Sequence, residues 1–169
     1  FILRDHQRVR IDAFLNPGDP SYEGNIQVIQ SMTAIGSGGF FGKGLFTGTI
    51  SQYGFLPVTE SDFIFAVLGE EFGFVGMAVV IILFFLFLSR IYSISKHAKD
   101  FYGTLVTTGF MGMLFYQILQ NIGMTIGLMP VTGVTLPFVS YGGSSMLTTM
   151  MIIALIMNIY SKSHSSFAY

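Results

Sequence analysis

Asp62 is the residue whose type and position in this sequence best suit chemistry. It lies where a polar stretch, residues 57–62, meets a long apolar run that begins at Phe63. A carboxylate can remove a proton from a nucleophile or bind a divalent metal ion. At a membrane surface, such a group is a candidate catalyst for reactions of lipid-linked substrates.

A structural role for Asp62 is also open. Thr59 precedes Asp62 by three residues, which is the spacing of a capping box, where an acidic side chain near a helix start bonds to free amides. Such a cap contributes about 0.5–2 kcal/mol. A capping role and a catalytic role for Asp62 are compatible, so both interpretations stay open.

Membrane helices are the elements that must position Asp62. The 169 residues are 51% hydrophobic and only 10% charged, whereas soluble domains carry about 25% charged residues. Three apolar stretches are candidate spans, because a helix needs roughly 20 residues to cross a bilayer. They cover residues 63–92, 104–128 and 144–160. The sequence therefore predicts an all-α integral membrane protein.

Loop charges predict the orientation of these spans. Residues 93–103 carry Lys96 and Lys99, while residues 129–143 carry no charge. Because short basic loops stay in the cytoplasm, residues 93–103 and the tail 161–169 are expected inside. Residues 1–62 and the extracellular or re-entrant loop 129–143 are then outside. The chain begins with Phe, and three spans bury their polar faces poorly, so we expect further helices upstream.

The outer region, residues 1–62, is expected to hold interfacial amphipathic helices. Apolar residues recur among polar ones at residues 9–15 and 26–35, and a glycine-rich run covers residues 36–44. This spacing is typical of helices that lie in the membrane interface. The chain has no cysteine, which excludes disulfides, and its net charge of -1 argues against a nucleic-acid partner.

Short motifs along the whole chain resemble one family of membrane proteins. In order, they are FLNP at 14–17, IQS at 29–31, AIGSGG at 34–39, GKG at 42–44, FLP at 55–57, DFIFAV at 62–67, EEFG at 70–73, NIG at 121–123 and PFVSYGGS at 137–144. They resemble the shape, elongation, division and sporulation (SEDS) family, which includes RodA, FtsW and SpoVE. The GKG segment and the threonines after it are more similar to the RodA branch.

The resemblance implies a fold and an activity. It implies the C-terminal three helices of a ten-span fold, preceded by a large extracellular loop, in the bacterial cell membrane. It also implies a peptidoglycan glycosyltransferase that polymerises lipid II for cell elongation and rod shape. The implied partners are a class B penicillin-binding protein, other membrane proteins of the elongation complex, undecaprenyl-linked glycan and membrane lipids.

Within the resemblance, Asp62 matches the loop aspartate that the family needs for polymerisation. The family commonly has histidine and threonine just before this aspartate, whereas Glu60 and Ser61 stand here. Asp62 is therefore a candidate general base, a candidate ligand of a divalent cation (Mg²⁺ or Mn²⁺), or both. Glu60, as a second carboxylate, is a candidate for holding a cation or substrate. No organic cofactor is expected.

Six further residues are candidate substrate contacts. Lys43, Arg8, Arg4 and Arg10 are cations that suit a lipid pyrophosphate. The more ordinary interpretation is that they are solvated surface charges, and Lys43 is the strongest candidate of the four because it lies in the glycine segment that resembles the family. Ser140 and Tyr141 offer hydroxyl groups in the uncharged loop. That loop is expected to line a groove or to form a tight turn, since irregular backbone at membrane depth must be buried in protein or line a cavity.

Polar residues inside the apolar stretches leave two interpretations open. Gln117, Asn121 and Thr125 recur every four residues, with Gln120 beside them; they indicate helix packing or a lipid path. Glu70 and its neighbour Glu71 lie two turns past Asp62. They are expected to face a polar groove or to pair with a basic residue on a helix outside this chain.

Three functions are consistent with these features. They are a lipid II polymerase, a lipid II flippase and a noncatalytic scaffold of the elongation or division complex. A flippase needs polar groups across several spans, whereas an outward-facing enzyme needs them at one end. The acidic residues gather at the outer end of the first span, which favours the enzyme.

Overall fold

The computed structural model describes residues 5–17, 19, 21–45, 47 and 62–164. All of its regular structure is helical, as the sequence predicts. The helices within the described residues are α1 (Asp5–Leu15), α2 (Glu23–Gly38), α4 (Ile64–Lys96), α5 (Phe101–Thr125) and α6 (Gly143–His164).

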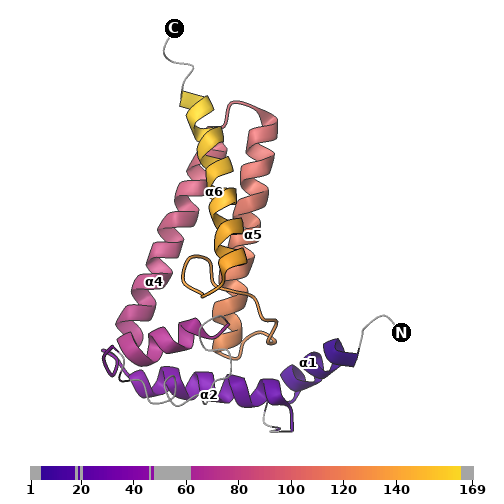
Figure 1. Ribbon diagram of the computed structural model, residues 1–169, viewed down its shortest axis with the longest axis vertical. Helices are drawn as coiled ribbons and strands as arrows, with labels where there is room; N and C mark the ends of the chain where they lie inside the picture. Colours follow the sequence, from indigo (N-terminus) through magenta and orange to yellow (C-terminus); the bar gives the residue numbers. More distant parts are fainter. Residues whose placement is uncertain (1–4, 18, 20, 46, 48–61, 165–169) are drawn as a thin grey trace.

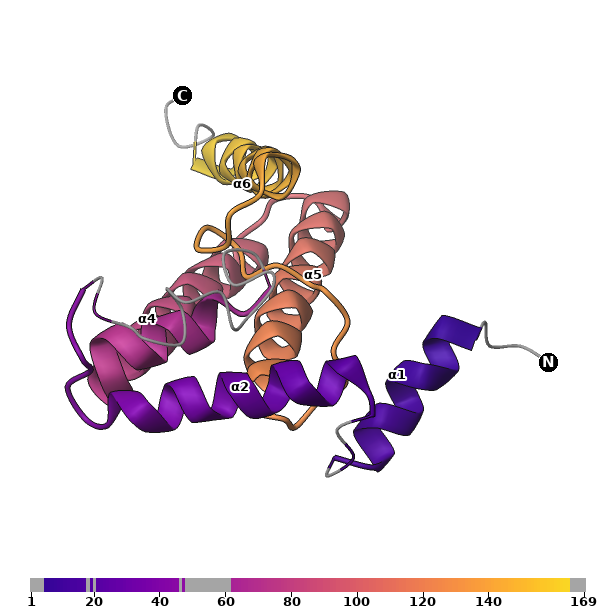
Figure 2. The same cartoon turned by 60° about the horizontal axis from the view of Figure 1, so that its bottom comes forward.

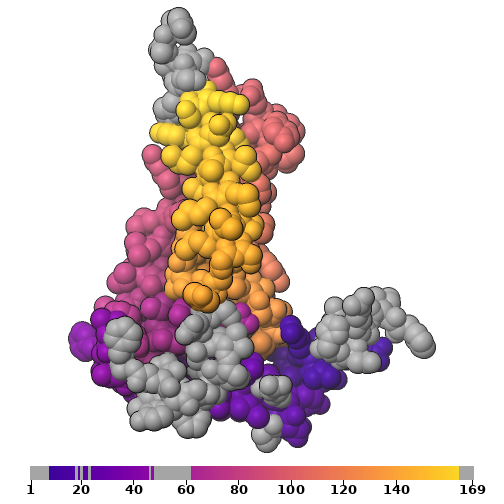
Figure 3. All heavy atoms as spheres, viewed as in Figure 1, coloured from indigo at the N-terminus to yellow at the C-terminus, as the bar shows by residue number. Residues whose placement is uncertain are grey.

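The helices form a bundle with a layer across one end. Figure 1 shows most of α4 standing beside α5 and α6, while α1 and α2 lie across the lower end. Seen from that end, α2 spans the base of the bundle and α1 extends beyond the start of α2 (Figure 2). In the space-filling view, α6 covers the seam between α4 and α5 (Figure 3).

Helix α4 is broken at Gly73, which the predicted continuous span 63–92 does not anticipate. Gly73 has φ 66° and ψ -162°, a backbone conformation that is accessible to glycine but not to other residues. The segment 64–72 lies alongside α2, and the remainder of α4 rises from the break to Lys96 (Figure 1). Asp62 and Glu70 are therefore at the two ends of a short helical segment at the base of the bundle.

The glycine-rich run after α2 supplies the hydrogen bonds that this break removes. In an unbroken helix, the amides of residues 74 and 75 would donate to the carbonyls of residues 70 and 71. Here Phe74 N donates to Gly39 O at 2.9 Å and Val75 N donates to Phe40 O at 3.2 Å. In return, Lys43 N donates to Glu70 O at 2.9 Å, and Gly44 N donates to Glu71 O at 3.1 Å.

Glycine is required where these two backbones meet. A Cβ atom on Gly42 would overlap the carbonyl of Glu71, and one on Gly38 would overlap the carbonyl of Gly69. Gly42 also has φ 78°, which other residues rarely adopt. The GKG segment thus allows the chain to approach the break in α4 closely enough for main-chain bonding.

Two described helices are long and apolar enough to cross a membrane. They are α4 and, over residues Gly143–Ser163, α6. Helix α5 has 25 residues and stands beside them, but its amide side chains lower its mean hydropathy, and it does not meet the same criterion. The second predicted span, 104–128, therefore stays a prediction.

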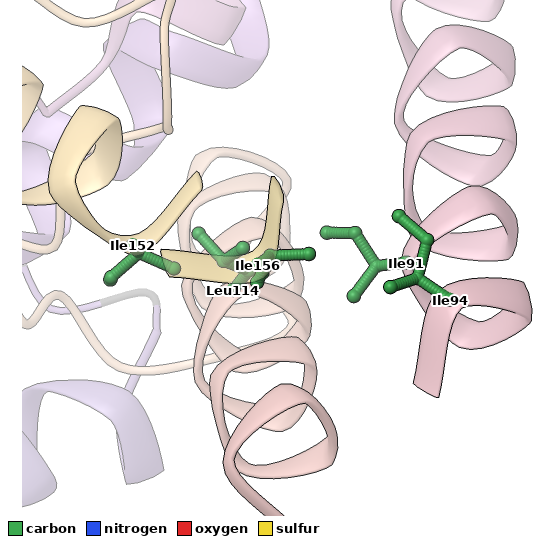
Figure 4. Packing of buried hydrophobic residues seen from close by; sticks show 5 residues of the cluster. All are labelled: Ile91, Ile94, Leu114, Ile152 and Ile156. Atoms are coloured by element: carbon green, nitrogen blue, oxygen red, sulfur yellow. The ribbon is translucent and has the colours of Figure 1, made fainter. Parts of the chain in front are cut away.

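The far end of the bundle is held by an apolar cluster. Figure 4 shows Ile91 and Ile94 of α4 near Leu114 of α5, with Ile152 and Ile156 of α6 completing the group. All five side chains are buried, and Leu114 is fully so. Two polar contacts of Ser95 lie nearby: its hydroxyl is 2.7 Å from that of Thr108 and donates to the carbonyl of Thr104 at 3.4 Å.

The α1–α2 connection is fixed by Asn25. Its side-chain amide donates to the carbonyls of Asn16 at 2.8 Å and Asp19 at 3.0 Å. The amide of Ser21 donates to Asp19 Oδ1 at 2.9 Å. Hydrogen bonds from the Ser21 side chain and backbone lower the pKa of Asp19 below its usual 3.8.

Helix α2 packs through its small residues and exposes its large ones. Ser31 and Ala34 are buried against the bundle, whereas Ile26, Ile29 and Met32 are exposed. An apolar face turned away from protein suits a helix that lies in a membrane interface. The interfacial position predicted for this helix stays a prediction.

Candidate functional site

Asp62 lies in the turn that leads into α4, and its main chain is held from the side by α5. Asn121 Nδ2 donates to the carbonyl oxygen of Asp62 at 2.9 Å. The same nitrogen donates to the carbonyl oxygen of Val134 at 2.8 Å. Asn121 is fully buried, so a single side chain links the Asp62 turn to the loop between α5 and α6.

The carboxylate of Asp62 lies over that loop. Its Oδ2 is 3.3 Å from the position that a Cβ atom would take on Gly133, whose φ is 70°. Because Gly133 has no side chain, the loop can approach the carboxylate closely. Asp62 is half-buried.

The start of α4 does not place Asp62 at the helical position that a capping box with Thr59 needs. A capping box requires Asp62 to lie in the first turn of the helix, but α4 begins at Ile64 with Phe63 as its N-cap. Ala66 N donates to Phe63 O at 2.9 Å, and the N-cap residue Phe63 makes no side-chain capping bond. Asp62 therefore precedes the helix, and Thr59 lies outside the described residues.

The polar stripe of α5 holds the loop. Gln120 Nε2 donates to Pro130 O at 3.0 Å, beside the two bonds from Asn121. Below them, Ser31 of α2 donates to the carbonyl of Thr125 at 2.8 Å. Gln120 and Asn121 thus bond within this chain, whereas Gln117 lines a cavity of about 210 Å³ between α5 and α6. Helix packing and a lipid path stay the two interpretations of the stripe.

The loop itself folds back into the bundle. Leu136 is buried with Phe65, Phe84 and Ile118. Phe138 adopts φ 64°, and its ring meets that of Phe87 edge to face at 5.6 Å. A positive φ at an aromatic residue is strained and persists only where surrounding contacts enforce it.

Lys43, a predicted substrate contact, pairs with Glu70. Lys43 Nζ lies 2.8 Å from Glu70 Oε1, and the glutamate side chain is fully buried while that of Lys43 is 29% exposed. A buried carboxylate needs such a partner. The partner expected for Glu70 on another helix is thus found within this chain, and substrate binding by Lys43 stays a prediction.

The other predicted contacts differ in exposure and in the element that carries them. Ser140 is buried, and its hydroxyl accepts a hydrogen bond from Leu136 N at 2.7 Å, so it shapes the loop. Tyr141 is exposed. Arg8 is exposed on α1, at the end of α2 away from the α4 break (Figure 2). Glu60 lies outside the described residues.

One large cavity lies near α1. It has a volume of about 720 Å³ and is lined by residues of α1, of α2 and of the loop segment 127–131. Its charged residue is Arg10, whereas Arg8 does not line it. Both arginines are exposed, and Arg10 is the one that lines this cavity.

A metal site is not complete within the described residues. They contain no group of three His, Cys, Asp or Glu side chains placed to hold an ion. Mg²⁺ is commonly held by one or two carboxylates together with substrate phosphates and water. Asp62 supplies one such ligand, which is not by itself a metal centre, so no chemical step below depends on a metal.

Comparison with known proteins identifies the family. The family model FTSW_RODA_SPOVE, described as cell cycle protein, matches residues 1–165. The chain belongs to this family. The resemblance to the SEDS proteins drawn from the motifs is thereby confirmed.

Several curated relatives are similar over almost all of this chain. Peptidoglycan glycosyltransferase RodA of Treponema pallidum is 45% identical over 161 residues, which cover 95% of this chain and 37% of that protein. Stage V sporulation protein E of Bacillus subtilis is 43% identical over 90% of this chain and 42% of that protein. Peptidoglycan glycosyltransferase MrdB of Escherichia coli K12 is 42% identical over 95% of this chain and 44% of that protein. The chain spans less than half the length of each.

Solved structures share the fold. A chain from a peptidoglycan synthase complex, described as coordinating polymerization and crosslinking, matches with a TM-score of 0.78 at 30% identity, covering 96% of this chain and 44% of that one. An aspartate mutant of Thermus thermophilus RodA matches with a TM-score of 0.61 at 30% identity, covering 92% and 47%.

Proposed function

We propose that this chain carries the catalytic carboxylate of a membrane peptidoglycan glycosyltransferase that polymerises lipid II. The observation that carries the proposal is the position of Asp62. Its main chain is bonded to α5, and its Oδ2 lies against Gly133 of a loop that the bundle holds in place. Relatives named peptidoglycan glycosyltransferase RodA and MrdB support this activity.

Asp62 is suited to act as a general base. The 4-hydroxyl of the acceptor sugar is a weak nucleophile until its proton is removed. In the proposed step, a carboxylate oxygen of Asp62 takes this proton as the hydroxyl oxygen attacks the anomeric carbon of the donor. The bond from that carbon to the pyrophosphate oxygen breaks, and undecaprenyl pyrophosphate leaves with the electron pair.

The distribution of charge supports an outward-facing site. The first part of α4, which follows Asp62 and contains Glu70, lies at the base of the bundle. The connection from α4 to α5, with Lys96 and Lys99, lies at the far end (Figure 1). Since basic loops favour the cytoplasm, the Asp62 end faces outward from the bacterial cell membrane. This chain would then form the last three spans and the large outer loop of a ten-span protein.

Partners and cofactors follow from the same proposal. The similarity to a chain of a peptidoglycan synthase complex supports a class B penicillin-binding protein as partner, and the similarity to RodA supports a role in elongation. A divalent cation, Mg²⁺ or Mn²⁺, bound by Asp62 together with substrate phosphate oxygens stays part of the proposal. Chelation followed by addition of each metal tests it.

The proposal is tested by polymerisation of purified lipid II with the full-length protein and its penicillin-binding partner. Asp62→Asn nearly preserves shape and removes the charge. We expect glycan product to fall by about 10²–10⁴-fold, the usual contribution of a general base, with complex formation unchanged. Undiminished polymer would rule out Asp62 as the base. A parallel assay of lipid II movement across vesicles tests the flippase alternative, and an intact complex with full polymerisation would leave Asp62 no catalytic role.

A further inference from the structure

Asn121 contacts both sides of the candidate site through one atom. Its Nδ2 carries two protons, and each is directed to a different segment: the carbonyl of Asp62 at 2.9 Å and the carbonyl of Val134 at 2.8 Å. Val134 follows Gly133, the residue over which the Asp62 carboxylate lies. The amide therefore sets the distance between the turn that carries the carboxylate and the loop that faces it.

The side-chain oxygen of Asn121, Oδ1, indicates that stability alone does not explain an asparagine at this position. Its Oδ1 is buried and has no hydrogen-bond partner within the described part of the chain. A buried acceptor without a partner is unfavourable and calls for an explanation. Retention of an amide here is explained if both of its N–H groups are needed to hold the two segments together.

We propose that Asn121 is a positioning residue of the polymerase, which holds the Asp62 carboxylate against the loop at Gly133 in the geometry that reaction requires. This inference rests on the proposed function, because it assigns to Asn121 an effect exerted through Asp62. A misplacement of about 1 Å can reduce a rate by about 10²-fold, so loss of the tether affects turnover without removing a catalytic group.

Gln120 provides a matched control on the same helix. It is buried, adjacent in sequence, and donates from Nε2 to Pro130 O at 3.0 Å. Gln120 thus holds the same loop by the same type of bond, and its bond ends on Pro130 rather than on the Asp62 turn. A role limited to loop anchoring predicts similar effects at the two positions, whereas positioning of Asp62 predicts a much larger effect at Asn121.

The experiment measures kcat and KM for lipid II with the full-length protein in complex with its penicillin-binding partner. For Asn121→Ala we expect kcat to fall by about 10–100-fold with KM changed less than about threefold. For Gln120→Ala we expect kcat to change less than about threefold. Equal losses at the two positions, or a loss confined to KM, would overturn the proposal.

A double-mutant cycle distinguishes an effect through Asp62 from a general one. Asp62→Glu moves the carboxylate and is expected to leave residual activity. If Asn121 acts through Asp62, adding Asn121→Ala to Asp62→Glu lowers kcat much less than it does in the wild type. Losses that multiply would contradict the proposal. Full activity of Asp62→Asn would instead remove the proposed function itself, so the two failures are distinguishable.

A second variant keeps the proposal testable if Asn121→Ala does not fold. Gly133 is exposed, and Gly133→Ala would place a methyl group 3.3 Å from Asp62 Oδ2. Alanine at φ 70° also strains the loop, so kcat is measured per folded complex, and we expect it to be lower with nearly unchanged KM. Wild-type kcat in this variant would show that the close approach of loop and carboxylate is not required, which would overturn the proposal.

Discussion

The two ends of the bundle are held by different kinds of interaction. At the base, side-chain amides from α5, an ion pair and main-chain bonds between residues 39–44 and 70–75 join the segments. At the far end, most contacts are those of the isoleucine and leucine cluster in Figure 4, and the polar contacts of Ser95 with Thr108 and Thr104 lie beside it. Directional bonds thus concentrate at the end that carries Asp62.

This difference has a physical reason. Apolar packing holds helices together but tolerates small shifts of one helix along another, because each atomic contact contributes only about 0.1–0.2 kcal/mol. Hydrogen bonds lose strength quickly with distance and angle, so several of them fix a backbone closely. A reacting carboxylate needs such fixed geometry, whereas the far end needs only cohesion.

The largest structural effect is expected where the two backbones meet. Gly42→Ala would place a methyl group into the Glu71 carbonyl and force alanine into φ 78°, so we expect a loss of about 3 kcal/mol or more. Gly36→Ala, at a helical position with open space around it, is expected to be neutral or stabilising by about 0.5–1 kcal/mol. Thermal unfolding of both variants in detergent is the measurement. Equal melting temperatures would contradict the main-chain exchange at the α4 break.

A smaller loss is expected when the ion pair is broken. Lys43→Met leaves the Glu70 carboxylate buried without the 2.8 Å contact to Lys43, which costs about 3 kcal/mol in buried pairs and less here because Lys43 is partly exposed. Adding Glu70→Gln to Lys43→Met should recover most of this stability. Chemical denaturation of the three proteins measures it, and a double variant no more stable than Lys43→Met would show that the pair is not the cause.

The smallest effect on activity is expected at the far end. Leu114 is fully buried in the apolar cluster, and Leu114→Ala leaves a cavity that costs about 2–3 kcal/mol. Because the cluster does not touch the Asp62 turn, polymerisation per folded complex should stay within about twofold of the wild type. A loss of turnover comparable to that of Asn121→Ala would show that the two ends are not independent.

The helical segments and the polar end were predictable from sequence, because hydropathy and charge mark them directly. The break at Gly73 was not predictable, because α4 is apolar on both sides of it. The main chain that bonds to the break is residues 39–44, which lie about 30 residues earlier in the sequence. The Lys43–Glu70 pair was not predictable for the same reason, because it joins the same two distant segments. In membrane helices, glycine is as consistent with close packing as with a break.

The candidate site was predictable in part. Asp62 was found from its place at the polar-to-apolar junction, and the stripe that contains Asn121 was visible as a four-residue repeat. The hydrogen-bond partners of the stripe could not be predicted from the sequence. Asn121 bonds to main-chain carbonyls, which every residue has, so no residue type marks them as partners. Ser140 was predicted for its hydroxyl, but that hydroxyl accepts a bond within its own loop.

The most direct test applies one substitution at both ends of the molecule. Asp62→Asn and Asp100→Asn each replace a carboxylate by an amide. Asp100 is exposed at the start of α5 and makes no side-chain capping bond. In lipid II polymerisation by the full complex, we predict a loss of about 10²–10⁴-fold for Asp62→Asn and less than about twofold for Asp100→Asn. Equal rates for the two variants would contradict the catalytic role of Asp62.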